Sequence, residues 1–149
     1  MRVADFCTTS TIVCSPATTV ASAAQMMRDH HVGDLVVADD SGGAVKPVGI
    51  LTDRDIVVAV IAQGLDPRAI LAGDVMSAQL LTVPGQADPF EAIATMRFKG
   101  VSRLPVVDEE GNLAGIVSSA DLLAYLTREM AALAGVRHRQ QAHEMQARP

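Results

Sequence analysis

Aromatic residues and lysine are scarce in this chain. Aromatic side chains make up only 3% of the 149 residues, tryptophan is absent, and Lys46 and Lys99 are the only lysines. The net charge is −5, so the clustered cations that neutralise nucleic-acid phosphates are missing, which excludes a general nucleic-acid binder. The core must be packed from aliphatic side chains and methionines, and the length allows one compact unit.

Long apolar runs and cysteines are also scarce. No run of 18 uncharged apolar residues occurs, and Asp5 stands where a signal peptide would continue its apolar core. These features predict a cytoplasmic protein without membrane contact. Cys7 and Cys14 are expected to be free thiols in a reducing compartment and to serve as small buried residues. A redox-responsive dimer that uses Cys7 or Cys14 is the alternative.

Catalytic and metal-binding motifs are missing as well. The sequence has no nucleophile elbow, no Gly-rich phosphate loop and no Cys-x-x-Cys pair. His30 and His31 are adjacent, so their side chains point in different directions on a helix, and His138 and His143 share no helical face. We therefore expect no enzyme activity, no catalytic cofactor and no metal site.

What the chain does contain is an internal duplication. The segment 48–56, VGILTDRDI, is matched by 114–122, AGIVSSADL. In each copy a glycine and two apolar residues lead to a hydroxyl side chain, and an aspartate follows three residues later. This pattern predicts a strand that runs into the start of a helix, where free backbone N–H groups, a hydroxyl and a carboxylate gather. Two related sites for a sugar-bearing ligand follow.

The duplication extends toward the start of each copy. The segment 32–39, VGDLVVAD, is matched by 101–108, VSRLPVVD, and both are typical of short strands closed by acidic turns. Apolar residues at helical spacing precede each strand, and a further short strand precedes each helix. Each repeat is therefore predicted to be an α/β unit of strand, helix, strand, strand and helix. Because a unit of this size is marginal alone, we expect two pseudo-symmetric repeats packed face to face, with two clefts between them.

The repeats also suggest segment boundaries. The chain divides into repeat one at 3–64, a linker at 65–72, repeat two at 73–127 and a polar C-terminal helix or tail at 128–149. The second helix of repeat one, 55–63, is apolar nearly all round, which predicts that it is buried.

Apolar helix faces further predict a homodimer. The side chains that we expect on these faces are Val57, Val60, Ile61, Leu122 and Leu126.

The duplicated motifs resemble a known family, the paired CBS domains, over roughly residues 3–127. The resemblance rests on Gly49 to Asp55, on Gly115 to Asp121 and on the two matched strands, all duplicated in order and in register. It implies a non-catalytic regulatory module that binds an adenosine-containing ligand such as AMP, ADP, ATP, NAD or S-adenosylmethionine and signals to a protein partner by conformational change. The alternative is an interaction or dimerisation module that keeps the fold without binding nucleotide.

The resemblance also implies that each cleft mixes the two repeats. One cleft would combine Ser118 and Asp121 with Val32 and Gly33, and the other Thr52 and Asp55 with Val101 and Ser102. An ionised carboxylate can accept both ribose hydroxyls, and aliphatic strand residues with free backbone groups suit adenine.

Candidate phosphate ligands differ between the copies. Arg103 falls where the family often places a phosphate-contacting residue, beside the Asp121 cleft, whereas its counterpart in repeat one is Asp34. Arg54 is the candidate cation of the Asp55 cleft, where we also expect Asp34 to add an anion. The Asp121 cleft should then prefer phosphorylated ligands more strongly.

Each of these residues also has a simpler structural interpretation. Asp55 and Asp121 can cap the helices that they open. Arg54 and Arg103 can form exposed ion pairs with neighbouring acids, and such pairs contribute little to stability.

Overall fold

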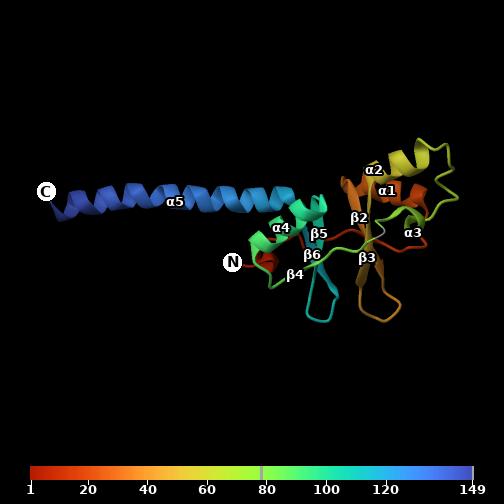
Figure 1. The fold of residues 1–149 in the computed structure, drawn as a ribbon, viewed down its shortest axis with the longest axis horizontal. Helices are drawn as coiled ribbons and strands as arrows, with labels where there is room; N and C mark the ends of the chain where they lie inside the picture. The colour runs from red at the N-terminus through yellow and green to blue at the C-terminus, as the bar shows by residue number, and fades with distance from the viewer. Residues whose placement is uncertain (78, 149) are drawn as a thin grey trace.

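Two small sheets of the same topology lie side by side, and α5 extends away from them (Figure 1). The computed structural model describes residues 1–77 and 79–148. In the first sheet, β1 (Val13–Cys14) pairs in parallel with β2 (Asp34–Asp39), which pairs antiparallel with β3 (Lys46–Thr52). In the second sheet, β4 (Val83–Pro84), β5 (Arg103–Val107) and β6 (Leu113–Ser118) pair in the same way. The predicted duplication of an α/β unit is confirmed.

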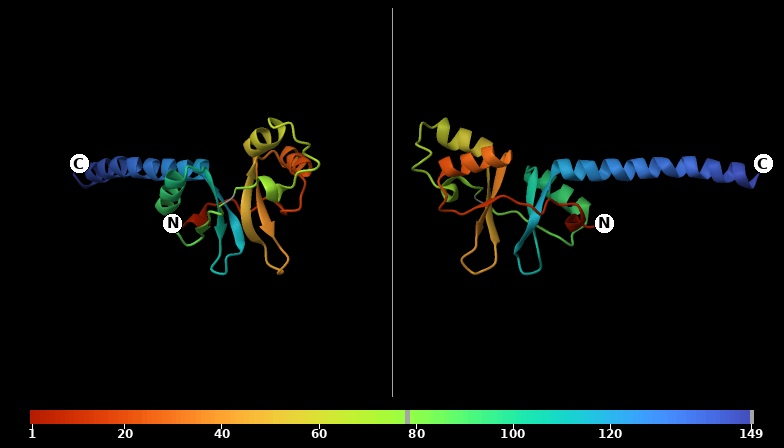
Figure 2. Two further views of the ribbon diagram at one scale, coloured as in Figure 1. Left: turned by 45° about the vertical axis from the view of Figure 1, so that its right-hand side comes forward. Right: turned by 180° about the vertical axis from the view of Figure 1, so that it is seen from behind.

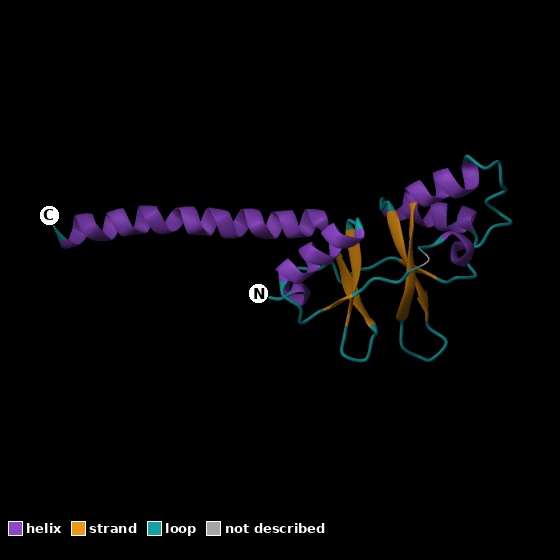
Figure 3. Ribbon diagram, in the orientation of Figure 1, coloured by secondary structure: helices purple, strands orange, loops and turns teal. Residues whose placement is uncertain are grey.

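Helices lie against each sheet (Figure 3). Repeat one contributes α1 (Val20–His30) and α2 (Asp53–Ile56), which continues into the π-helix η2 (Val57–Ile61). Repeat two contributes α4 (Pro89–Lys99) and α5 (Ser119–Ala147). Local sequence explains where these helices begin, because the Thr19 side chain caps α1 and the Asp88 side chain caps α4, with proline at its first position. Gly100 ends α4 in the left-handed conformation that favours glycine.

The buried side chains form two aliphatic clusters, one under each sheet. Methionine and small residues fill the space between the sheet and its helices, as the shortage of aromatics predicts. The first cluster includes Val20, Met27, Leu35, Val37, Leu51 and Val60, and the second includes Val83, Met96, Leu104, Val106, Val117 and Leu122.

The first segment of each repeat packs against the core of the other repeat. The short 3-10 helix η1 (Val3–Asp5) lies beside the second sheet (Figure 2), where Val3 is completely buried. The Val3 N–H donates to the carbonyl of Ala87 at 3.0 Å, and Thr8 pairs with Ile116 in an antiparallel bridge. The two repeats therefore exchange their first segments.

The reciprocal half of this exchange involves α3 (Ala72–Val75). Ala72 is buried in the first core, and its N–H donates to the carbonyl of Thr18 at 2.7 Å. Thr19 pairs with Leu71 in a second antiparallel bridge. Neither core is therefore built from one continuous stretch of chain.

The exchanged segments contact equivalent glycines, which gives a testable contrast. A Cβ atom added at Gly115 would lie 2.7 Å from the backbone oxygen of Thr8, whereas one added at Gly49 would lie 2.8 Å from the sulfur of Met76. A flexible side chain can move aside, but the backbone of a paired segment cannot. We expect Gly115→Ala to lower the free energy of unfolding by about 1–3 kcal/mol, and Gly49→Ala to cost clearly less. Urea denaturation measures both, and equal losses would contradict the expectation.

The second helix of repeat one is only partly buried, so the prediction of a buried helix at 55–63 is wrong. The helix begins at Asp53, and only Ile56 and Val60 are buried, because one face of the helix covers the sheet. The side chains of Val57 and Ile61 are 56% and 54% exposed.

The predicted dimer surface also needs correction. Val60 is completely buried in the first core, and Leu122 is buried in the second, so neither is available to a second copy. Val57 and Ile61 remain exposed, and Leu126 is partly exposed.

The C-terminal segment is one continuous helix. α5 runs through Gly135 to Ala147 and projects away from both sheets (Figure 1). Beyond its first turns its apolar side chains are exposed, including Met130 at 71% and Leu133 at 73%. Within the described part of the chain, no helix combines the length and apolar character that crossing a membrane requires.

Candidate functional site

The duplicated motif forms two equivalent strand-to-helix junctions, one at Thr52 and one at Ser118. In each junction the hydroxyl accepts a hydrogen bond from the N–H of the following aspartate, Asp55 or Asp121, at 3.1 Å. One oxygen of that aspartate, Oδ2, accepts in return from the backbone N–H of Thr52 at 2.9 Å or of Ser118 at 2.8 Å. Both aspartates therefore cap their helices in reciprocal capping boxes.

Capping leaves one carboxylate oxygen of each aspartate available. Asp55 and Asp121 are both partly buried and line cavities. In the part of the chain that the structure describes, every hydrogen bond to either carboxylate uses Oδ2, and that of Asp121 also accepts from the Ser118 hydroxyl at 2.7 Å. The other oxygen, Oδ1, can accept a hydrogen bond from a ligand, so capping and ligand contact are compatible.

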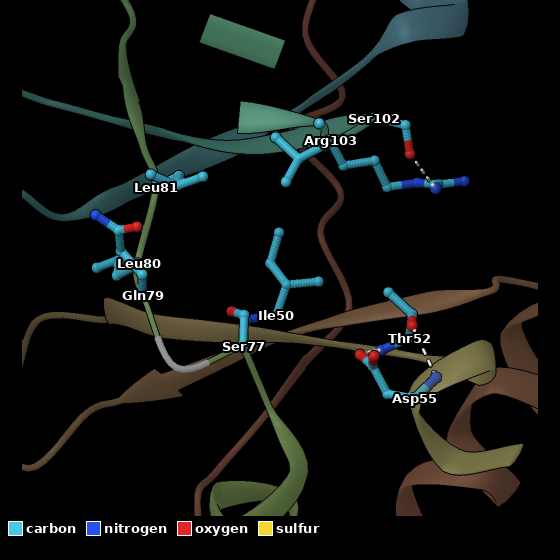
Figure 4. A pocket seen from close by; sticks show the side chains of 11 residues that line it. Ile50, Thr52, Asp55, Ser77, Gln79, Leu80, Leu81, Ser102 and Arg103 are labelled. Atoms are coloured by element: carbon cyan, nitrogen blue, oxygen red, sulfur yellow. Dashed lines mark hydrogen bonds between the residues drawn. The ribbon is translucent and has the colours of Figure 1, made fainter. Parts of the chain in front are cut away.

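The Asp55 cleft is a cavity of about 290 Å³ between the two repeats (Figure 4). Thr52 and Asp55 come from the end of β3 and the start of α2, and they face residues that precede and open β5. The lining consists of Ile50, Thr52, Asp55, Ser77, Gln79, Leu80, Leu81, Gly100, Val101, Ser102 and Arg103. The structure thus brings together the four residues expected for this cleft.

The Asp121 cleft is a cavity of about 310 Å³ with the equivalent position in repeat two. Its lining consists of Thr8, Ser10, Thr11, Ile12, His31, Val32, Gly33, Asp34, Arg103, Ile116, Ser118 and Asp121. Here too the four expected residues lie together, with Val32 and Gly33 contributed by repeat one. Each cleft therefore mixes the two repeats.

The sequence interpretation missed the segments that connect the repeats to their first strands. The Asp121 cleft is lined by Thr8, Ser10, Thr11 and Ile12, and the Asp55 cleft is lined by Ser77, Gln79, Leu80 and Leu81. The duplication could have revealed these segments, because residues 5–7 and 74–76 align and place both connecting segments at equivalent positions.

Arg103 and Asp34 contact each other instead of facing separate clefts. They open the equivalent strands β5 and β2, and Nε of Arg103 forms an ion pair with Oδ2 of Asp34. Arg103 lines both cavities, whereas Asp34 lines the Asp121 cleft. The expectation that Asp34 adds an anion to the Asp55 cleft is therefore wrong, because equivalent positions meet where the repeats pack together.

Arg54 does not take the position expected of a phosphate ligand. Its side chain is exposed, and it is absent from the described linings of both clefts. Its backbone N–H donates to the carboxylate of Asp53 at 2.8 Å. Since neither Arg54 nor Asp34 belongs to the Asp55 cleft, the predicted difference in phosphate preference loses its structural basis.

The environment of Asp34 opposes its ionisation. Only 14% of the side chain is exposed, and this burial raises the pKa of the Asp34 carboxyl above its ordinary value. The nearby Arg103 lowers that pKa, and the charge of Asp53 raises it. The ion pair with Arg103 therefore holds a carboxylate that is poorly hydrated.

The two thiols lie in different cores and are poorly suited to redox chemistry. Cys14 is buried in the first core, and Cys7 packs against the second. Burial raises the pKa of both thiols, which reduces the fraction of reactive thiolate. This disfavours the redox-responsive dimer. Across residues 1–77 and 79–148, no three His, Cys, Asp or Glu side chains are grouped so that they could hold a metal ion.

Comparison with known proteins places this geometry in a family. An uncharacterized protein of Methanopyrus kandleri is 39% identical over 109 residues, which is 73% of this chain and 54% of that protein. Hypoxic response protein 1 of Mycobacterium tuberculosis is 38% identical over 108 residues, or 72% of this chain and 73% of that protein. The match therefore spans only about half of the first relative.

Solved structures and family models agree with these relatives. The CBS domain pair of protein MJ0100, solved in complex with 5′-methylthioadenosine and S-adenosylmethionine, has a TM-score of 0.75 and 25% identity. The similarity covers 87% of this chain and 98% of that chain. The model of the CBS domain matches residues 3–62 and 72–128, which are most of the sequence. The chain belongs to the CBS domain family.

Proposed function

We propose that this protein is a non-catalytic regulatory module that binds adenosine-containing ligands in its two clefts and signals their presence to a protein partner. The observation that carries the proposal is that Asp55 and Asp121 line the two cavities while Oδ1 of each accepts no hydrogen bond from the described residues. An ionised carboxylate in this position can accept hydrogen bonds from a ribose.

The rest of the Asp55 cleft suits the base, and both cavities are small. In the Asp55 cleft, Ile50, Leu81 and Val101 offer aliphatic contact for a flat adenine ring. Cavities of about 290 and 310 Å³ are at the lower end of the usual range for ligand sites. Each cavity is therefore of a size to hold the adenosine part that AMP, ADP, ATP and NAD share. The adenosine derivatives bound by the MJ0100 CBS pair support the same ligand class.

Signalling follows from the mixed composition of the clefts. Because both repeats line each cavity, a ligand stabilises the arrangement of repeats that it contacts best, and it shifts the population only as far as its affinities differ. A protein effector then binds one arrangement of the repeats in preference to the other. We also propose a homodimer, now assigned to the exposed apolar side chains of Val57, Val58 and Ile61.

A thermal-shift panel tests the proposal. Adenosine, AMP, ADP, ATP, NAD and S-adenosylmethionine are compared at millimolar concentration, with GMP as the control that keeps the sugar and phosphate but changes the base. A ligand at 100 times its Kd stabilises by about 2.7 kcal/mol, so we expect an adenosine compound that reaches this saturation to raise Tm by roughly 5–11 °C. If none raises Tm, the proposal is contradicted and the interaction-module alternative is favoured.

A further inference from the structure

The two clefts meet at a single cation. Arg103 opens β5 between the cavities, and it is the only arginine or lysine among the described residues that line either one. Its side chain is 42% exposed, so it can reach solvent and ligand. A phosphate bound in either cleft would therefore find the same guanidinium.

Arg103 is already held in place by protein groups. Its Nε contacts Oδ2 of Asp34, and its Nη1 donates weakly to the Ser102 hydroxyl at 3.3 Å. A guanidinium binds phosphate best through two parallel N–H groups in a fixed plane. It cannot present that pair of donors to a phosphate on each side while also pairing with Asp34.

Charge makes this cation necessary in both clefts. The Asp121 cleft contains the carboxylates of Asp34 and Asp121, and the Asp55 cleft contains that of Asp55. Without Arg103, no arginine or lysine among the described lining residues would offset the carboxylate of the Asp55 cleft or the two carboxylates of the Asp121 cleft.

We propose that Arg103 is a phosphate ligand shared by both clefts, so that phosphorylated ligands in the two clefts antagonise each other, with Asp34 as the internal competitor for the same guanidinium. This inference rests on the proposed function. The shared guanidinium predicts different binding behaviour for nucleotides and nucleosides, because a nucleoside lacks the phosphate that competes for Arg103. AMP binding should be antagonistic between clefts, whereas adenosine binding should lack this component.

Calorimetric titration of variants in which one cleft is weakened tests the sharing. Asp55→Asn and Asp121→Asn each leave one intact cleft, and Arg103→Gln is added to each. The measured quantity is the ratio of AMP affinity to adenosine affinity. Since a hydrogen bond to a charged group contributes about 1.5–3 kcal/mol, we expect Arg103→Gln to lower this ratio about tenfold or more in both backgrounds. Arg128→Gln, an equal change of charge at an exposed position of α5, is the control and should leave the ratio unchanged.

Asp34→Asn is expected to increase AMP affinity, and misfolding would not produce such an increase. Removal of the competing carboxylate frees Arg103, so AMP affinity should rise several-fold relative to adenosine in both clefts. In the wild-type protein, the ratio of the second to the first dissociation constant should be several-fold larger for AMP than for adenosine.

The outcomes distinguish the two proposals. A fall of the ratio in one background only, or equal stepwise ratios for AMP and adenosine, would overturn the sharing while leaving the proposed function intact. Absence of binding by both AMP and adenosine to the wild-type protein would overturn the proposed function and the sharing together.

Discussion

Removal of residues 1–9 is expected to unfold the second core, although these residues begin repeat one. Val3 is fully buried in that core, which contributes about 1.5–3 kcal/mol. The segment also makes four backbone hydrogen bonds with repeat two, Val3 N to Ala87 O, Ala4 N to Gly85 O, Thr8 N to Ile116 O and Ile116 N to Thr8 O. At about 1 kcal/mol each, these bonds and the buried valine approach the total stability of a small domain, about 5–15 kcal/mol.

Truncation at the other end is the matched control. Ending the chain after Arg137 removes a similar number of residues from the exposed end of α5. This change should alter the free energy of unfolding by less than about 1 kcal/mol, because exposed helix ends contribute little packing. Urea denaturation followed by circular dichroism compares the two truncations. A similar loss from both would show that the exchanged segment is not required by the second core.

Replacement of Asp55 or Asp121 with asparagine is expected to weaken binding in the corresponding cleft by about 10–100-fold. The amide keeps an acceptor for the backbone cap, but it loses the charge that strengthens hydrogen bonds from ribose hydroxyls. The ligand with the largest thermal shift is titrated by calorimetry. Each single variant should weaken one of two sites, and the double variant should lose most of the stabilisation by ligand.

Asp74→Asn separates ligand binding from capping. Oδ2 of Asp74 accepts from the N–H of Leu71 at 3.1 Å, which is the capping role of Asp55 and Asp121. Asp74, however, belongs to neither described cleft lining. We expect Asp74→Asn to change Tm about as much as the other two substitutions while ligand affinity stays constant. An equal loss of affinity would mean that the aspartates act on the ligand only through the stability of their helices.

The sequence was sufficient for the strand-to-helix junctions and for the repeated sheets, which depend on local pattern. The spacing of Thr52 and Asp55, and of Ser118 and Asp121, predicts the strand-to-helix junctions, because capping groups act within one turn. Duplication in register predicts equivalent sheets, since the same pattern of apolar residues forms the same elements twice. These features follow from residues that are close together in the chain.

Features that depend on long-range packing could not be predicted. No local pattern shows that Val3 enters the second core, because its burial depends on how the two repeats pack. The contact between Arg103 and Asp34 has the same origin. Val57 and Ile61 are apolar, yet more than half of each side chain is exposed. The apolar composition of their helix therefore predicted more burial than the structure shows.

Because α5 is one continuous helix, a rotation at its start moves its far end by a larger distance. Its N-cap is Ser118, a residue of the Asp121 cleft, and its 29 residues reach Ala147 without a break. At 1.5 Å per residue the arm is about 43 Å long, so a rotation of about 5° at the cleft displaces its far end by about 4 Å. A small rotation at the start of this helix therefore becomes, at its far end, a displacement about as large as the diameter of a side chain.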